Sequence, residues 1–165
     1  MEKNLKIGID FHGVISASPE AFGVFCHEIR RLGVMVYVIS GGPLADVRAF
    51  LMKHGIEFDE VWAIADYYCG KGDAKYFDDG SFFVPTELWD KAKGAFCAKE
   101  GILFHIDDSP IYGKHFVTPY CQYDLKTGGC WLNNGVEVDF NEPKAAAQTV
   151  AHLINGLAVS QEGQV

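Results

Sequence analysis

Short apolar runs recur along the first two thirds of the chain, and each is followed by a segment of different periodicity. We expect strands at residues 6–9, 34–39, 60–64 and 102–106. The run at 34–39 is too short for a helix and is apolar on both faces, which is typical of a central strand in a parallel sheet.

Helical periodicity separates these runs. Three helices are predicted to begin near Pro19, Pro43 and Pro85 and to end near Gly33, Gly55 and Gly101. Strands that alternate with helices predict an α/β fold with a parallel sheet and right-handed crossovers.

The segment 65–84 departs from this alternation. Its second half, 75–84, predicts a β-hairpin that turns at Asp79-Gly80. Two interpretations stay open: a lid whose aromatic side chains stack on a substrate, or a surface hairpin whose aromatic residues belong to the core. Beyond the strand at 102–106 we expect another strand within 116–124, a hairpin over 131–140 turning at Asn134-Gly135, and a helix over 143–157. Residues 1–160 then form a single domain, followed by a flexible tail at 161–165.

Composition describes an ordinary globular chain. Its 165 residues suit one domain with a full core, and 48% of them are hydrophobic and 22% charged. The formal charge of -8 argues against a surface that binds a nucleic-acid polymer or anionic lipid. Neither a signal-peptide core nor an apolar run of membrane-spanning length is present, so we expect a cytoplasmic protein without a membrane partner.

The five cysteines form an odd set without a CxxC pair, which fits a reducing compartment better than a disulfide framework. A zinc site is a minor alternative, because the spacings match no common zinc pattern. Its ligands would come from Cys69, Cys121, Cys130, His105 and His115.

Three predicted strands end in residues that bind metals or phosphate: Asp10, Ser40 and the pair Asp107-Asp108. In a parallel sheet these ends share one edge, where ligands bind. Carboxylates brought together there repel one another unless a cation neutralises them, and oxygen ligands favour Mg²⁺. Each stretch alone is typical of a turn or cap, but their occurrence at successive strand ends indicates a site.

The residues at these strand ends resemble the motifs of the haloacid dehalogenase (HAD) superfamily, whose members are mostly phosphatases with an aspartate nucleophile. Ile9–Val14 resembles the first motif, Val36–Gly41 the second and Phe104–Ser109 the fourth. The resemblance implies a three-layer Rossmann-like sheet of the HAD type, with a small β-hairpin insertion and no large cap domain. It also implies Mg²⁺-dependent hydrolysis of a small phosphorylated substrate.

Transferred to this chain, the resemblance implies that Asp10 is both nucleophile and metal ligand. The carbonyl of His12 and the carboxylate of Asp108 would complete the magnesium site, with Asp107 assisting directly or through water. The hydroxyl of Ser40 and the amides of Gly41 and Gly42 would hold the phosphoryl oxygens.

The resemblance also requires a lysine on or before the helix that precedes 102–106, and Lys91, Lys93 and Lys99 all qualify. Lys91 and Lys93 flank opposite edges of the predicted apolar face of that helix, whereas Lys99 lies near its far end. That face consists of Leu88, Ala92, Ala95 and Phe96. We choose Lys91 as the catalytic and phosphate-binding lysine because it is closer to the helix start. An alternative for each of the three lysines is an ordinary surface charge exposed to solvent.

His12 departs from the family pattern, which usually has a second aspartate there as general acid and base. A histidine titrates near neutral pH and can do the same work. Two alternatives stay open: a catalytically impaired HAD-like protein that binds without turnover, and a receiver-like domain that keeps a phosphorylated aspartate. The substrate and the oligomeric state are not determined.

Overall fold

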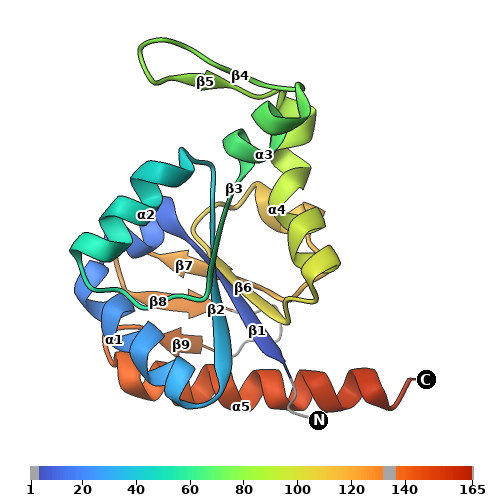
Figure 1. Ribbon diagram of the computed structural model, residues 1–165. Coiled ribbons are helices and arrows are strands. Elements are labelled where there is room, and N and C mark those ends of the chain that lie inside the picture. Colours follow the sequence, from blue (N-terminus) through green and yellow to red (C-terminus); the bar gives the residue numbers. More distant parts are fainter. Residues whose placement is uncertain (1–3, 132–136, 165) are drawn as a thin grey trace.

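The computed structural model describes residues 4–131 and 137–164 and shows an α/β fold around one seven-stranded sheet (Figure 1). The strand order is β3-β2-β1-β6-β7-β8-β9, parallel from β3 to β7 and antiparallel beyond. The strands are β1 (Leu5–Asp10), β2 (Val34–Ser40), β3 (Glu60–Ala63), β6 (Phe104–Asp107), β7 (Tyr120–Asp124), β8 (Gly129–Trp131) and β9 (Glu137–Asp139).

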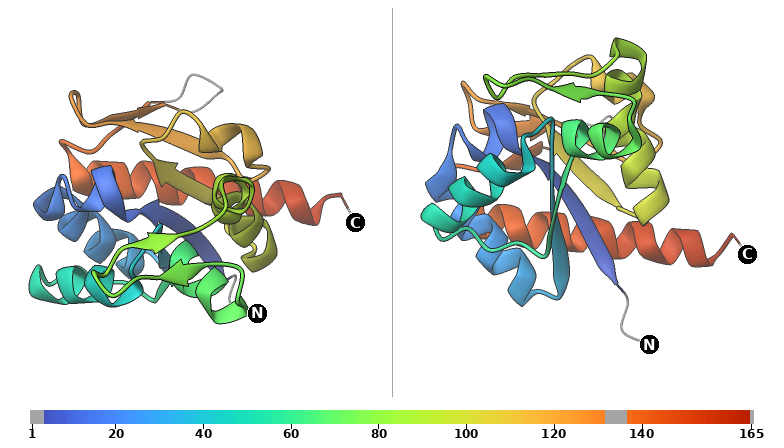
Figure 2. Two further views of the ribbon diagram at one scale, coloured as in Figure 1. Left: turned by 90° about the horizontal axis from the view of Figure 1, so that it is seen from above. Right: turned by 45° about the horizontal axis from the view of Figure 1, so that its top comes forward.

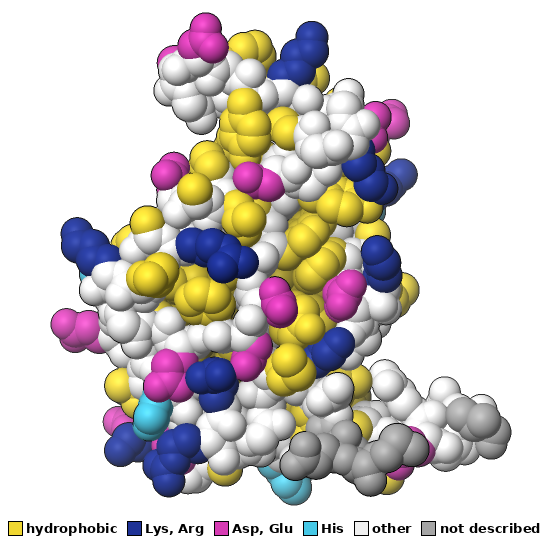
Figure 3. Space-filling view, in the orientation of Figure 1, with side chains coloured by type: hydrophobic (Ala, Val, Ile, Leu, Met, Phe, Trp, Pro, Cys, Tyr) yellow, Lys and Arg dark blue, Asp and Glu magenta, His cyan; other side chains and the backbone are white. Residues whose placement is uncertain are grey.

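Helices cover both faces of the sheet, which gives the three layers expected from the alternating pattern. On one face, α1 (Pro19–Arg31), α2 (Leu44–Lys53) and α5 (Pro143–Glu162) form the larger core. On the other face, α3 (Ile64–Lys71) and α4 (Thr86–Glu100) cover a smaller one. Hydrophobic side chains remain visible on the surface over α3 and α4 (Figure 3).

Strand β2 shows why the continuous apolar run at 34–39 forms a central strand. Val36 and Val38 enter the larger core, whereas Tyr37 and Ile39 point to the opposite face and enter the smaller one. Because both faces are covered, every position must be apolar. The predicted strands around 6–9, 60–64 and 102–106 and the three helices between them are confirmed, with small shifts at their ends.

The segment 65–84 begins with α3, a helix that the sequence pattern did not predict. After Gly72, whose φ is 82°, β4 (Lys75–Tyr76) and β5 (Phe82–Phe83) pair antiparallel as a separate two-stranded sheet. The turn between them contains Gly80 in the left-handed region, as the sequence Asp79-Gly80 predicts. This hairpin projects from the end of the molecule that holds the carboxyl ends of the strands (Figures 1 and 2).

The C-terminal third contains the expected strand, edge pair and helix, with different element boundaries. A short 3₁₀ turn, η2 (Tyr112–His115), precedes β7, so the strand begins later than residue 116. Strand β8 pairs with both β7 and β9, while the predicted turn at Asn134-Gly135 lies outside the described residues. Helix α5 continues to Glu162 instead of ending at residue 157, so it includes the first part of the predicted tail.

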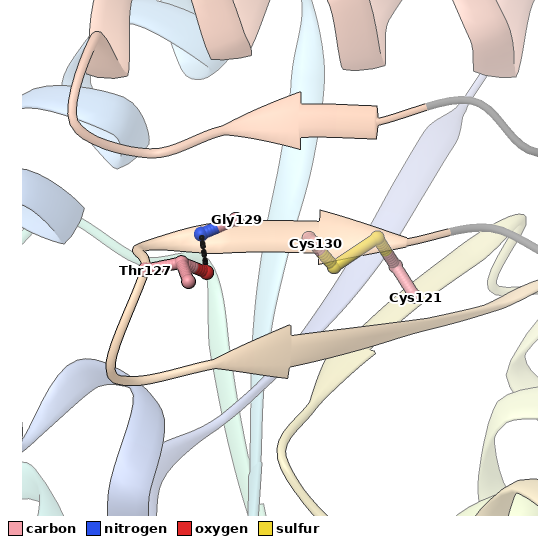
Figure 4. Close-up of a disulfide and its surroundings, with 4 residues drawn as sticks. All are labelled: Cys121, Thr127, Gly129 and Cys130. Carbon is pink, nitrogen blue, oxygen red and sulfur yellow. Dashed lines mark hydrogen bonds between the residues drawn. A yellow bond between two sulfur atoms is a disulfide. The ribbon is translucent and has the colours of Figure 1, made fainter.

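A disulfide joins Cys121 on β7 to Cys130 on β8 (Figure 4). This bond corrects the expectation of a chain without disulfides and removes both cysteines from the alternative zinc site. Cys26 and Cys97 are buried free thiols. No helix in the described part of the chain is long and apolar enough to cross a membrane.

Candidate active site

The central order β2-β1-β6 brings three functional strand ends to one edge of the sheet. Asp10 ends β1, Ser40 ends β2 and Asp107 ends β6. Carboxylate oxygens of Asp10, Asp107 and Asp108 lie within 4.8 Å of one another, with the first two side chains buried and Asp108 exposed. The predicted acidic cluster is therefore present.

Lys93 on α4 reaches into this cluster. Its Nζ donates hydrogen bonds to Oδ1 of Asp10 at 2.7 Å and to Oδ2 of Asp107 at 2.9 Å, and its side chain is 5% exposed. Lys91 is exposed to solvent. The structure therefore places Lys93, the alternative to Lys91, at the acidic cluster, whereas the predicted Lys91 does not reach it.

The buried face of α4 explains this correction. The predicted face carried Leu88, Ala92, Ala95 and Phe96, whereas the residues actually buried are Ala92, Lys93, Gly94 and Cys97. A β-carbon at Gly94 would lie 2.3 Å from the carbonyl oxygen of His115, so the glycine allows α4 to approach η2 closely. The helix thus turns a lysine inward because two carboxylates compensate the loss of its hydration.

His105 lies beside the acidic cluster, although the sequence suggested it only as a ligand of the alternative zinc site. It is fully buried on β6, its Nε2 lies 3.0 Å from Oδ2 of Asp107, and its ring stacks on Phe116. Burial lowers the pKa of His105 despite the opposing effect of Asp107, so a neutral ring donates this hydrogen bond. The sequence did contain a signal, since a histidine two positions before Asp107 shares its face of the strand.

Asp107 is held by three donors. Lys93 and His105 donate to Oδ2, and the backbone N–H of Ser109 donates to Oδ1 at 3.1 Å. Burial alone would raise the pKa of Asp107, but the hydrogen bond from His105 and the charge of Lys93 outweigh it and hold the pKa well below its usual range. Asp107 is therefore an anion that orients Lys93.

Asp10 has the opposite electrostatic balance. Burial raises its pKa to about 8, the charges of Asp107 and Asp108 act in the same direction, and Lys93 opposes them. Three carboxylates around one point, with oxygen as the only ligand atom, fit a hard divalent cation. Such a cation would relieve the repulsion and favour ionised Asp10 at neutral pH.

The turn after β1 positions His12 and Asp108. His12 keeps extended backbone angles, and Gly13 follows with φ at 79°. A β-carbon on Gly13 would lie 2.3 Å from Oδ2 of Asp108, so the carboxylate packs directly on the glycine. The exposed His12 ring points to the loop after β2, with Nε2 3.3 Å from the carbonyl oxygen of Gly42.

That loop contains the predicted phosphate-binding residues. The Oγ of Ser40 is buried and accepts a hydrogen bond from the N–H of Gly42 at 3.1 Å. The carbonyl of Gly41 accepts a hydrogen bond from the N–H of Ala65 on α3. Because Oγ is the acceptor, the Ser40 hydroxyl proton can point elsewhere, whereas the Gly42 amide must change partner before it binds a phosphoryl oxygen.

The sheet edge thus holds a lysine-bridged acidic cluster in an α/β protein of Rossmann-like architecture. No family model matches the sequence, and no curated protein matches it either. Inferences about function therefore depend on the geometry of these residues.

Proposed function

We propose that this chain is a Mg²⁺-dependent phosphomonoester hydrolase of the HAD type, acting through a phospho-aspartate at Asp10 on a small phosphorylated substrate. The supporting observation is the position of Lys93 between Asp10 and Asp107, with Asp108 beside them. A phosphoryl group that approaches Asp10 would meet a cation on one side and the Ser40 loop on the other, which is what its charged oxygens require.

Asp10 and Asp108, with the carbonyl of His12, would hold the magnesium ion. When bound, the ion would neutralise the carboxylates and polarise the phosphoryl oxygens. Asp107 would take part chiefly by orienting Lys93, because both of its oxygens already accept hydrogen bonds.

The reaction would proceed in two displacements. A carboxylate oxygen of Asp10 forms a bond to phosphorus while the ester P–O bond breaks, and protonated His12 gives its proton to the leaving alkoxide. Water then attacks phosphorus, the bond to Asp10 breaks, and His12 takes the proton of that water. Inorganic phosphate leaves, and Asp10 and His12 return to their starting states. The His12 ring, beside Gly42 and open to solvent, is available for both transfers.

A phosphate-release assay over a panel of phosphomonoesters tests this proposal. We expect repeated turnover with Mg²⁺, loss of turnover on chelation, and no turnover by Asp10→Asn. His12→Ala should lower kcat, while His12→Asp should retain more activity. A stable phospho-aspartate without turnover would instead support the receiver-like alternative, and binding without reaction would support the catalytically impaired one.

The expected cytoplasmic location stays a prediction. The Cys121–Cys130 disulfide weighs against it, because disulfides persist mainly in oxidising compartments. Counting the free thiols of protein isolated under alkylating conditions would decide whether this bond forms in the cell.

A further inference from the structure

A set of aromatic side chains borders the proposed phosphate site. The ring of Trp89, on α4, lies so close to Gly41 that a β-carbon there would be 2.5 Å from it. Its Nε1 donates a hydrogen bond to the hydroxyl of Tyr112 at 2.6 Å. The Nζ of Lys93 lies 5.2 Å from the centre of the Tyr112 ring. Trp89 and Tyr112 therefore connect the phosphate loop with the buried lysine.

The hairpin adds two further rings. Phe82 on β5 stacks on Trp89, with ring centres 5.9 Å apart and an interplanar angle of 24°. Tyr76 on β4 is the cross-strand partner of Phe82, so both side chains lie on the same face of the hairpin. In the view from above, the hairpin crosses in front of the edge where the strands end (Figure 2).

Two hydrogen bonds that share one acceptor also connect the hairpin to the residues that follow the Ser40–Gly42 loop. The hydroxyl of Tyr76 donates to Oδ2 of Asp66 at 2.8 Å, and the same oxygen accepts the N–H of Leu44 at the start of α2. Pro43 directly precedes Leu44 and follows the Ser40–Gly42 loop. The hairpin is thus attached on both sides of the loop, through Asp66 and through Trp89.

We propose that Tyr76, Phe82, Trp89 and Tyr112, here called the aromatic face, bind a planar aromatic group in the leaving alcohol of the substrate. The proposal rests on the proposed function. In-line attack by Asp10 would leave the ester oxygen on the side of phosphorus away from that carboxylate. The surface beside Gly41 and Lys93 is aromatic, because Trp89 contacts Gly41 and Tyr112 lies near Lys93. Phe82, Trp89 and Tyr112 are only half-buried, so each keeps surface for contact with a ligand. Aromatic rings pair favourably with other rings in offset-stacked or edge-to-face contacts.

The opposite face of the hairpin supplies a matched control. Phe83 follows Phe82, points to the other side of the strand and is 58% exposed. Its cross-strand neighbour is Lys75 rather than Tyr76. A contribution specific to the aromatic face should therefore depend on Phe82 and not on Phe83.

Non-hydrolysable phosphonates separate this proposal from the proposed function, because their binding needs no turnover. In calorimetric titrations with Mg²⁺ present, we expect the wild type to bind benzylphosphonate about tenfold more tightly than propylphosphonate or cyclohexylmethylphosphonate. The preference should fall to about twofold or less in Phe82→Ser and Trp89→Leu and stay at the wild-type level in Phe83→Ser. Circular dichroism checks that each variant is folded. If Trp89→Leu does not fold, the comparison of Phe82→Ser with Phe83→Ser alone tests the proposal.

A second pair of ligands places the ring further from phosphorus: a nucleoside 5′-monophosphate against ribose 5-phosphate, both titrated with Asp10→Asn to prevent turnover. A preference in either pair that depends on Phe82 supports the proposal and tells whether the ring sits beside the phosphate or beyond a sugar. Equal binding within both pairs, or an equal effect of Phe83→Ser and Phe82→Ser, would overturn it. A protein that releases no phosphate but binds the aromatic phosphonates more tightly would contradict the proposed hydrolysis. It would still support the aromatic binding site.

Discussion

Lys93 and Asp10 are separated by 83 positions in the chain, yet they form a buried ion pair with 2.7 Å between Nζ and Oδ1. The pair joins α4 to the end of β1, and the second hydrogen bond of Lys93 joins both to Asp107 on β6. The ammonium group of Lys93 thus holds α4, β1 and β6 together at the acidic cluster.

Replacement of Lys93 by Met should strongly lower the phosphatase kcat, whereas Lys91→Met should keep activity close to that of the wild type. Removing one stabilising charge from such a site typically lowers kcat by about 10²- to 10³-fold. The variant should also lose about 3–5 kcal/mol of unfolding free energy, since the buried carboxylate of Asp107 loses its cation. Kinetics and urea unfolding of the two variants measure both effects, and equal behaviour of Lys91→Met and Lys93→Met would contradict the assignment.

Asp10→Asn should stabilise the metal-free protein, increasingly so as pH rises. The pKa of Asp10 in the folded protein is about 8, above its ordinary value of 3.8. Between these values the folded state binds more protons than the unfolded state, so wild-type stability falls with rising pH. Asparagine does not titrate, so the stability of Asp10→Asn does not fall with rising pH for this reason.

Thermal unfolding of both proteins at pH 5 and pH 8, with and without Mg²⁺, measures the effect of Asp10. The difference in Tm should grow toward pH 8 in the absence of metal. Mg²⁺ should raise Tm of the wild type and have little effect on Asp10→Asn. A pH-independent difference, or an equal response to Mg²⁺, would count against both the pKa shift and the metal site.

Gly13→Ala should weaken Mg²⁺ binding, and Gly33→Ala should not. Both glycines have positive φ, 79° and 83°, so alanine costs about 1–2 kcal/mol of backbone energy at either position. Only at Gly13 would the new methyl group meet a side chain, the carboxylate of Asp108, while nothing lies within 4 Å at Gly33. Mg²⁺ titration followed by calorimetry distinguishes the two variants, and similar affinities would show that Asp108 does not depend on this contact.

Asp59→Asn should destabilise the protein at neutral pH by about 1–3 kcal/mol. Its carboxylate accepts hydrogen bonds from the Arg30 guanidinium and from the N–H of Val36, which joins α1 to β2. Partial burial alone would raise the pKa of Asp59, but these donors lower it below 3.8. The stabilisation is therefore fully present above pH 3.8 and is lost as pH falls through the lower pKa of the folded state.

Glu57 supplies the control for Asp59, because it also pairs with Arg30 but is 43% exposed. Glu57→Gln should cost less than Asp59→Asn, because solvent screens an exposed ion pair. Urea unfolding from pH 2 to pH 7 should show the deficit of Asp59→Asn shrinking toward zero at the acid end. A deficit that stays constant with pH would mean that the carboxylate charge does not contribute.

Most of the sheet could be predicted from local pattern. The apolar run at 34–39 and the strand end at Asp10 are short-range signals, and the burial of both faces of β2 confirms their interpretation. Helix α3 was missed because its eight residues carry only a short apolar pattern before the hairpin. The Cys121–Cys130 bond was missed because cysteine spacing does not reveal which strands lie side by side.

The sequence by itself determined which residues stand at the carboxyl ends of the strands, since strand periodicity and strand boundaries are local properties. It did not determine which lysine faces them. Apolar periodicity placed Lys91 and Lys93 equally at the margins of α4, and only the assembled sheet brings Asp10 and Asp107 to the position that makes a buried Lys93 favourable. The same holds for His105 and for Trp89 beside Gly41, because desolvation, charge pairing and ring contacts arise between segments that meet only in the tertiary structure.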